Sequence, residues 1–279
     1  MVLSVLLPVY LGTQSEELQA CLDSLCDQTY HADEILLVKD GPLQPNTERV
    51  IEEYNSTLPL KLLTFQDNRG IGAALQDALP LCSYPLVARV DSDDRCLPRR
   101  FETQMDFLEE NPTISVVGGQ MRELYTFRGC VEEAIRLSPT DPSTLAKYAK
   151  FRNPMNHPTV MFRKSDVLRC GGYEECHLFE DYLLWAKMLV SDYTLANISD
   201  VLVETDINDD YFRRRGGIDY LKDEVTLCSH FVQLGFFSLV DSILFLSTRA
   251  PIRLLPQYAR QHIYRLSLRR KRKQRSEGT

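Results

Sequence analysis

The chain has 279 residues, of which 44% are hydrophobic and 25% are charged, and this composition is that of an ordinary globular protein. The length suffices for one elaborated α/β domain or two small ones. The eight cysteines form no Cys-x-x-Cys pair, so free thiols in a reducing compartment are expected and a zinc site is not. No charged, apolar and small-residue leader opens the chain, so we expect no signal peptide.

The net charge of −7 is distributed unevenly along the chain. Residues 249–279 contain ten arginines and lysines and one glutamate, whereas residues 1–248 carry a net charge of −16. A basic segment attached to an acidic body predicts an anionic partner surface. Lipid headgroups fit better than nucleic acid, because no nucleic-acid recognition motif accompanies the basic run and the acidic body would repel phosphates.

The first 118 residues alternate between two periodicities. Short apolar runs typical of strands buried on both faces occupy residues 3–9, 34–38, 61–65, 86–90 and 114–118. Segments with helical spacing of apolar residues lie between them, at 15–28, 48–55, 70–81 and 97–112. This repetition predicts right-handed crossovers and an open, largely parallel α/β sheet.

The alternation loosens after residue 119. We expect two short helices and much polar loop in residues 120–157, and later strands at 159–162 and 201–205. Helices are expected from Lys164, at 180–189 and at 219–234. For residues 231–248, an amphipathic helix on the body or in a membrane interface is favoured over a transmembrane helix, because polar residues interrupt a run that is barely long enough to span.

Four segments follow the predicted strands at their carboxyl ends, which is the edge where open parallel sheets bind ligands. They are Pro8-Val9-Tyr10, Asp40-Gly41, the segment 68–72 and the segment 91–94. We therefore expect these four segments to converge on one site.

Two of these segments have the residue types that a nucleotide would need. Asp40 can accept a hydrogen bond from a nucleobase N–H while Gly41 allows a tight turn, although an Asp-Gly turn without a ligand is equally consistent. Segment 68–72 reads Asn-Arg-Gly-Ile-Gly, so Arg69 and two open backbone positions, one of them Gly70, stand at a helix start and suit phosphates. Ordinary strand-to-helix turns use the same glycines.

Three aspartates within four positions point to a cation. Asp91 and Asp93 are spaced to face one Mg²⁺ or Mn²⁺ ion with Ser92 turned away, and such ions complete their shell with phosphate oxygens and water. Asp94 precedes a helix that Pro98 suits, so a turn or helix cap explains it. Capping by the whole triplet is the alternative.

An ordered set of motifs resembles bacterial family 2 glycosyltransferases, and most closely those that build capsular and exopolysaccharide repeat units. The motifs are SVLLPVY (4–10), ILLVKDG (35–41), NRGIGAALQDAL (68–79), RVDSDD (89–94), NHPTVMF (156–162), GGY (171–173) and EDYLLW (180–185). The resemblance covers about residues 1–215. It implies a GT-A fold, in which a Rossmann-like sheet flanked by helices binds a nucleotide-sugar, and transfer of the sugar with inversion, assisted by Mn²⁺ or Mg²⁺.

The resemblance also implies a division of the chain. Residues 1–217 would form the catalytic domain, with a nucleotide-sugar-binding half (1–95) and an acceptor-binding half (96–217). Residues 218–279 would form a helical extension with a basic, membrane-proximal tail.

Carried over residue by residue, the resemblance makes Asp40 the base-reading carboxylate and Asp91-Ser92-Asp93 the DXD motif, with Asp93 the direct metal ligand. Asp181, preceded by Glu180, matches the catalytic base that takes a proton from the acceptor hydroxyl. An acidic first helical turn favoured by the helix dipole is the plain alternative for this pair.

Two further positions have divided interpretations. Arg213 and its two arginine neighbours resemble a basic loop that closes over the diphosphate, but a solvated basic run has the same appearance. His157 is expected near the acceptor or diphosphate, with a buried structural histidine as the alternative. The chain departs from the family at Lys39, where many members have an acid, and at Asp77.

The expected function is transfer of a sugar, from a donor that we expect to be UDP-linked, to a polyprenyl-diphosphate-linked saccharide. The enzyme would lie in the cytoplasm, attached peripherally to the anionic inner face of the membrane. A sugar-nucleotide pyrophosphorylase and a non-catalytic membrane-associated protein of the same fold are the alternatives. The first would need a basic, glycine-rich loop after the first strand, where this chain has only Gly12 and no cation.

Overall fold

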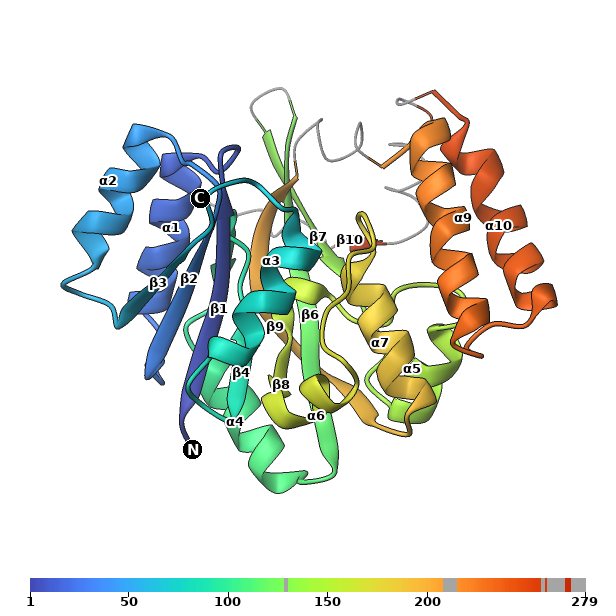
Figure 1. The fold of residues 1–279 in the computed structure, drawn as a ribbon, viewed down its shortest axis with the longest axis horizontal. Coiled ribbons are helices and arrows are strands. Elements are labelled where there is room, and N and C mark those ends of the chain that lie inside the picture. The colour runs from blue at the N-terminus through green and yellow to red at the C-terminus, as the bar shows by residue number, and fades with distance from the viewer. Residues whose placement is uncertain (128–129, 208–214, 257–258, 260–268, 272–279) are drawn as a thin grey trace, which may run out of the picture.

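A ten-stranded sheet forms the centre of the computed structural model, which describes residues 1–127, 130–207, 215–256, 259 and 269–271 (Figure 1). Along the sheet the strand order is β10-β7-β6-β8-β4-β1-β2-β3, and β9 pairs with both β6 and β5 beside this path. The first four strands are β1 Leu3–Tyr10, β2 Glu34–Asp40, β3 Leu60–Thr64 and β4 Leu86–Arg89. The others are β5 Asp94–Cys96, β6 Ile114–Phe127, β7 Cys130–Arg136, β8 Met161–Arg163, β9 Thr194–Ile207 and β10 Arg269–Lys271.

The first half of the sheet is parallel, as the alternation of strands and helices predicts. Strands β4, β1, β2 and β3 are neighbours in that order and run in the same direction. Strand β1 is apolar on both faces because it is covered on both: Leu3, Val5 and Leu7 belong to one core cluster and Leu6 to the other.

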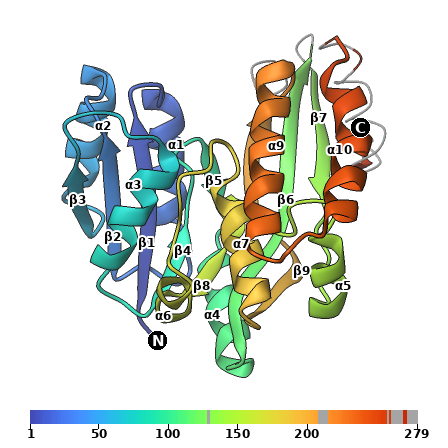
Figure 2. The same ribbon diagram turned by 45° about the vertical axis from the view of Figure 1, so that its right-hand side comes forward.

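Helices cover both faces of the sheet (Figures 1 and 2). One face is packed by α1 Ser15–Cys26, α2 Pro45–Tyr54 and α4 Arg100–Glu110. The other is packed by α3 Ile71–Ala78, α5 Pro142–Tyr148, α6 Lys164–Arg169 and α7 Glu180–Val190, with short 3₁₀ turns at Leu79–Leu81 and His157–Thr159. The predicted α/β class, a mostly parallel sheet flanked by helices, is confirmed.

The second half of the sheet is mixed, and here one prediction is wrong. The region expected to contain two short helices instead holds the hairpin of β6 and β7, followed by α5 alone. Buried Met121, Glu123 and Tyr125 alternate with the less buried Arg122 and Leu124. This period of two is the signature of a strand. This part of the strand contains polar residues on both faces, so it has no apolar run by which the sequence would indicate it.

Two C-terminal helices, α9 Ile218–Gln233 and α10 Leu239–Arg253, pack on α7 at the end of the molecule opposite β3 (Figures 1 and 2). A turn at Gly235, whose φ is +71°, separates them, so residues 231–248 do not form one helix. No helix in the described ranges is both long and apolar enough to cross a bilayer. Most of the basic tail lies outside the described residues, although β10 pairs with β7.

The cysteines whose side chains the structure describes are free thiols, as their spacing predicts. These are Cys21, Cys26, Cys82, Cys96, Cys170, Cys176 and Cys228.

Candidate active site

A cavity of about 490 Å³ opens at the carboxyl edge of β1, β2 and β4. This volume is within the usual range for small-molecule sites. The predicted site residues that line it are Pro8, Val9, Tyr10, Asp40, Arg69, Gly70, Asp91, Ser92, Asp93 and Glu180. All four strand-end segments therefore meet at one place, and their individual roles remain predictions.

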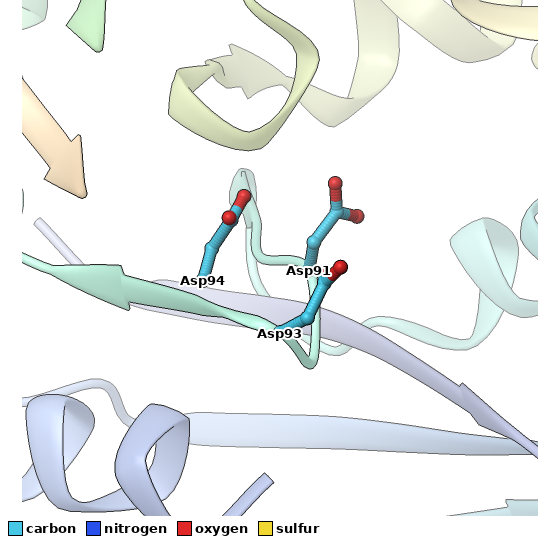
Figure 3. A group of neighbouring side chains, drawn as sticks. All are labelled: Asp91, Asp93 and Asp94. Carbon is cyan, nitrogen blue, oxygen red and sulfur yellow. The ribbon is translucent and has the colours of Figure 1, made fainter. Parts of the chain in front are cut away.

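The acidic turn after β4 places three carboxylates on one side of the chain (Figure 3). Each of Asp91, Asp93 and Asp94 offers an oxygen, and these oxygens lie within 4.8 Å of one another. The turn is closed by the Asp94 N–H, which donates to the Asp91 carbonyl at 3.2 Å. Asp94 caps no helix, since it begins β5 and α4 starts only at Arg100, so its carboxylate belongs to the cluster.

The carboxylates of this turn repel one another in a partly buried setting. Burial raises the pKa of Asp94 well above its usual value, and the charges of Asp93 and Asp91 raise it further. Neighbouring carboxylates are costly to keep ionised unless a positive charge offsets their repulsion. Hard divalent cations such as Mg²⁺ and Mn²⁺ bind carboxylate oxygens and supply that charge, so this cluster fits such an ion. Ser92 adds a link to the first strand end, with its Oγ 3.4 Å from Thr13 Oγ1.

Arg89, at the end of β4, is a site residue that the sequence reasoning missed. Its side chain is fully buried, lines the cavity and forms an ion pair with Asp91. Its Nη1 also donates to the Val90 carbonyl, while its Nε has no hydrogen-bond partner among the described residues. The available signal was an arginine inside an otherwise apolar strand, because charged residues are rarely buried unless they are paired.

Asp40 fastens the loop that joins β3 to α3. Its Oδ1 accepts the Arg69 N–H at 2.8 Å and its Oδ2 accepts the Gly70 N–H at 3.0 Å. The next residue, Gly41, has a φ of +87°, and a Cβ there would lie 2.7 Å from the Asn68 nitrogen. The Asp-Gly pair is therefore required by the contact between two strand ends.

The guanidinium of Arg69 is held at the rim of the cavity. It donates to Asp77 Oδ2 at 2.7 Å and lies 4.7 Å from the centre of the Phe65 ring. Asp77, one of the two departures from the family pattern, thus pairs with the predicted phosphate-binding cation. Both side chains are well exposed, so the pair is weak and an anionic ligand can compete for Arg69.

Glu180 and Asp181 open α7 with different surroundings. Glu180 lines the cavity, whereas Asp181 is buried beside it and accepts hydrogen bonds from Asn153 Nδ2 at 2.6 Å and the Tyr182 N–H at 2.7 Å. Burial and the charge of Asp181 raise the pKa of Glu180 to about 8. Burial raises the pKa of Asp181 to about 6, with the Asn153 hydrogen bond opposing it. Both carboxyl groups are therefore harder to ionise than ordinary ones, and Glu180 is harder to ionise than Asp181.

His157 lies behind the cavity and does not line it. Its Nε2 is 2.9 Å from the Tyr173 hydroxyl, and its ring meets the Trp185 ring edge-on. Burial lowers the pKa of His157 well below its usual value, and the Arg89 charge lowers it further. These contacts agree with the structural alternative. Arg213 and Arg214 lie outside the described residues.

Comparison with known proteins identifies the family. The sequence model described as "Glycosyl transferase family 2" matches residues 4–172. An uncharacterized glycosyltransferase of Haemophilus influenzae is 39% identical over 96% of this chain and 99% of its own length. The amylovoran biosynthesis glycosyltransferase AmsE of Erwinia amylovora is 34% identical over 94% of this chain and 97% of its own. The UDP-Gal:alpha-D-GlcNAc-diphosphoundecaprenol beta-1,3-galactosyltransferase of Escherichia coli is 36% identical over 96% of both chains.

Two solved structures share the fold. One is TarS residues 1–349 from S. aureus in complex with UDP-GlcNAc, with a TM-score of 0.68 and 19% sequence identity. The match covers 92% of this chain and 76% of the TarS chain. The other is the mannosyltransferase PcManGT from Pyrobaculum calidifontis in complex with GDP-Man and Mn²⁺, with a TM-score of 0.64 and 17% sequence identity. The match covers 95% of this chain and 75% of the PcManGT chain. The GT-A fold is thereby confirmed, and the chain belongs to glycosyltransferase family 2.

Proposed function

We propose that this glycosyltransferase transfers a hexosyl residue, with inversion, from a UDP-linked donor to a polyprenyl-diphosphate-linked saccharide in bacterial surface polysaccharide synthesis. The observation that carries the proposal is the meeting of the acidic turn and Glu180 in one cavity. The names of the relatives support the pathway, since one serves amylovoran biosynthesis and another acts on a diphosphoundecaprenol-linked sugar.

The acidic turn and the loops beside it are proposed to hold the donor. Asp93, with Asp91, would bind Mn²⁺ or Mg²⁺, and PcManGT with GDP-Man and Mn²⁺ offers a precedent on the same fold. When bound, the cation stabilises the charge that develops on the leaving diphosphate. Each Asp40 oxygen keeps a lone pair for a nucleobase N–H. Arg69, which lines the same cavity, is proposed to bind the diphosphate, and a part for Arg213 stays a prediction.

Asp181 is the proposed base and Glu180 a proposed hydrogen-bond donor. The acceptor hydroxyl transfers its proton to the Asp181 carboxylate while its oxygen forms the new bond to C1 of the sugar. The bond from C1 to the diphosphate oxygen breaks and its electron pair leaves with the diphosphate, so no covalent enzyme intermediate is needed. A protonated Glu180 would donate to a sugar hydroxyl in the cavity, and burial and the charge of Asp181 favour that form by raising the pKa of Glu180.

The division of the chain remains part of the proposal. The cavity is lined mainly by residues between Pro8 and Asp93, which supports a donor half at 1–95. Residues 175–178 and Glu180 close its other side, which agrees with an acceptor half at 96–217. Residues 218–279 would then serve as the membrane-proximal extension.

We place the enzyme in the cytoplasm, attached peripherally to the anionic inner leaflet through its basic segment. Each arginine or lysine near such a surface contributes on the order of 1 kcal/mol. Replacing the eight basic residues after α10 with glutamine should reduce binding to anionic vesicles at low salt. Binding equal to that of the unmodified chain, at every salt concentration, would refute this attachment.

A panel of nucleotide-sugars tests the activity, with hydrolysis and transfer measured with and without Mn²⁺. We expect turnover with one base and only with the cation. Asp181→Asn should bind donor but lose turnover by at least about 10²-fold, and Glu180→Gln should lose less. Full activity in Asp181→Asn would remove it from the mechanism. Family membership removes the pyrophosphorylase alternative, and absence of turnover across the panel would favour the non-catalytic one.

A further inference from the structure

The outer surface of α10 has the opposite polarity from that of an ordinary surface helix. Its exposed positions recur every three to four residues and contain no charged side chain. They form the α10 outer face, which consists of Leu239, Val240, Ile243, Leu244, Ser247, Thr248, Pro251 and Leu254. The five leucine, valine and isoleucine side chains among them are each more than half exposed to solvent. Surface helices normally present charged and polar residues to water and bury such a stripe.

The charged side chains of α10 are directed to partners within the protein. Asp241 accepts hydrogen bonds from Ser238 and caps the helix. Arg253 is buried and pairs with Glu224 of α9 at 2.8 Å. Arg249 lies 3.5 Å from the same glutamate. The charged side chains of α10 therefore have partners within the protein, and its outer side is left uncharged and mainly apolar.

We propose that the α10 outer face inserts into the interface of an anionic lipid bilayer. Helices that lie in the membrane plane combine an apolar face with a polar face rich in arginine and lysine, and in this chain the basic residues follow the helix. Here the 26 residues that follow α10 contain eight arginines and lysines and one glutamate. The basic residues would supply attraction to headgroups, and the apolar face would supply a contribution that salt does not screen. The inference rests on the proposed membrane-bound acceptor.

The position of α10 relative to the acid pair suits this role. The Phe245 ring lies 6.3 Å from the Tyr182 ring, and Tyr182 directly follows Asp181 in α7. In both views α10 is the outermost element at this end of the molecule (Figures 1 and 2). A membrane at the outer face would thus lie on the side of the molecule where α7 carries the proposed base.

A second copy of the chain is a poorer occupant of this face. A helix of 15 residues is about 22 Å long, and with a width of about 10 Å its outer side covers roughly 220 Å². Stable protein interfaces bury about 800 Å² per partner. A bilayer sets no such minimum, because apolar side chains partition individually.

Vesicle sedimentation of the full chain tests the proposal. With vesicles of phosphatidylethanolamine and phosphatidylglycerol, high salt should weaken binding but leave a residual fraction bound. Ile243→Glu and Leu239→Glu should each lower that residual partition about tenfold or more, since each removes an aliphatic side chain that the bilayer would bury. Leu62→Glu, at a half-exposed position of β3 on the opposite sheet edge, is the matched control and should bind like the unmodified chain.

Two results would overturn the inference. One is unchanged partition of Ile243→Glu, which would mean that the rest of the chain covers the face. The other is a dimer in solution that Ile243→Glu dissociates. Mn²⁺-dependent nucleotide binding, measured on the same variants, reports separately on the proposed function, because a protein without that binding could still show the Ile243-dependent partition.

Discussion

At the scale of single residues, the site depends on charges that have been removed from water. Arg89 is a fully buried cation beside Asp91, and its charge lowers the pKa of Glu180. Burial acts in the other direction on Glu180 and Asp181, whose pKa values it raises. The outcome is that Glu180 holds its proton more tightly than Asp181 does. When two neighbouring carboxyl groups have different pKa values, one can act as a base while the other acts as a hydrogen-bond donor.

Arg89 is predicted to be a positioning residue for the acidic turn. Arg89→Met leaves the partly exposed Asp91 without its ion-pair partner, which should reduce the free energy of unfolding by about 1–3 kcal/mol. Turnover should fall about 10–100-fold, because Asp91 loses the contact that orients it. Arg89→Lys keeps the charge without the planar guanidinium and should be less destabilised. Urea unfolding and steady-state rates measure both effects, and a stability change below about 1 kcal/mol in Arg89→Met would contradict this role.

The pH profile should show which carboxyl group is the base. Burial favours the neutral form, so the pKa of Asp181 is raised to about 6 and the ionised base is lost below that pH. We expect kcat/KM to fall about tenfold per pH unit below 6. Glu180→Gln should keep this limb, because Glu180 is already neutral there. An acid limb that disappears in Glu180→Gln would transfer the role of base to Glu180.

The same pKa shifts affect stability. The folded state binds more protons than the unfolded chain wherever a carboxyl pKa is raised on folding. The contribution of Glu180 and Asp181 to stability is therefore complete below the ordinary carboxyl pKa. It is lost as the pH rises through about 6 for Asp181 and about 8 for Glu180.

At the scale of elements, the strand ends and the loops after them decide the shape of the site. Predicting the strands β1 to β4 from apolar runs was enough to predict which loops meet, because parallel strands end at one edge. The contact between Gly41 and Asn68 was beyond that reasoning, since it depends on how closely two neighbouring loops approach. The β6–β7 hairpin was missed because its pattern of burial appears only when the partner strands are known.

Alanine substitutions at two glycines distinguish the destabilisation caused by a loop contact from that caused by backbone strain alone. Gly41→Ala and Gly235→Ala both place a side chain at a positive φ, which costs about 1–2 kcal/mol. Only at position 41 would the new Cβ meet backbone, 2.7 Å from the Asn68 nitrogen, whereas nothing lies within 4 Å at position 235. Thermal unfolding should therefore show a larger loss for Gly41→Ala, accompanied by weaker nucleotide binding. Equal losses with unchanged binding would contradict the proposed role of this contact.

At the scale of the whole molecule, the order of motifs along the chain predicted the family and the fold. The segments 4–10, 35–41, 68–79 and 89–94 all contribute to the lining of one cavity, as the topology of a parallel sheet requires. Features set by partners distant in sequence could not be predicted. The burial of Arg89, the different environments of Glu180 and Asp181 and the reversed polarity of α10 all depend on which elements pack together.

Titration calorimetry with UDP in the presence of Mn²⁺ tests the central claim most directly, which is that the acidic turn binds a nucleotide diphosphate through a divalent cation. The unmodified chain should bind the nucleotide, and binding should disappear when a chelator is added or when Asp93 is replaced by alanine. Nucleotide binding that is unaffected by both treatments would contradict the account.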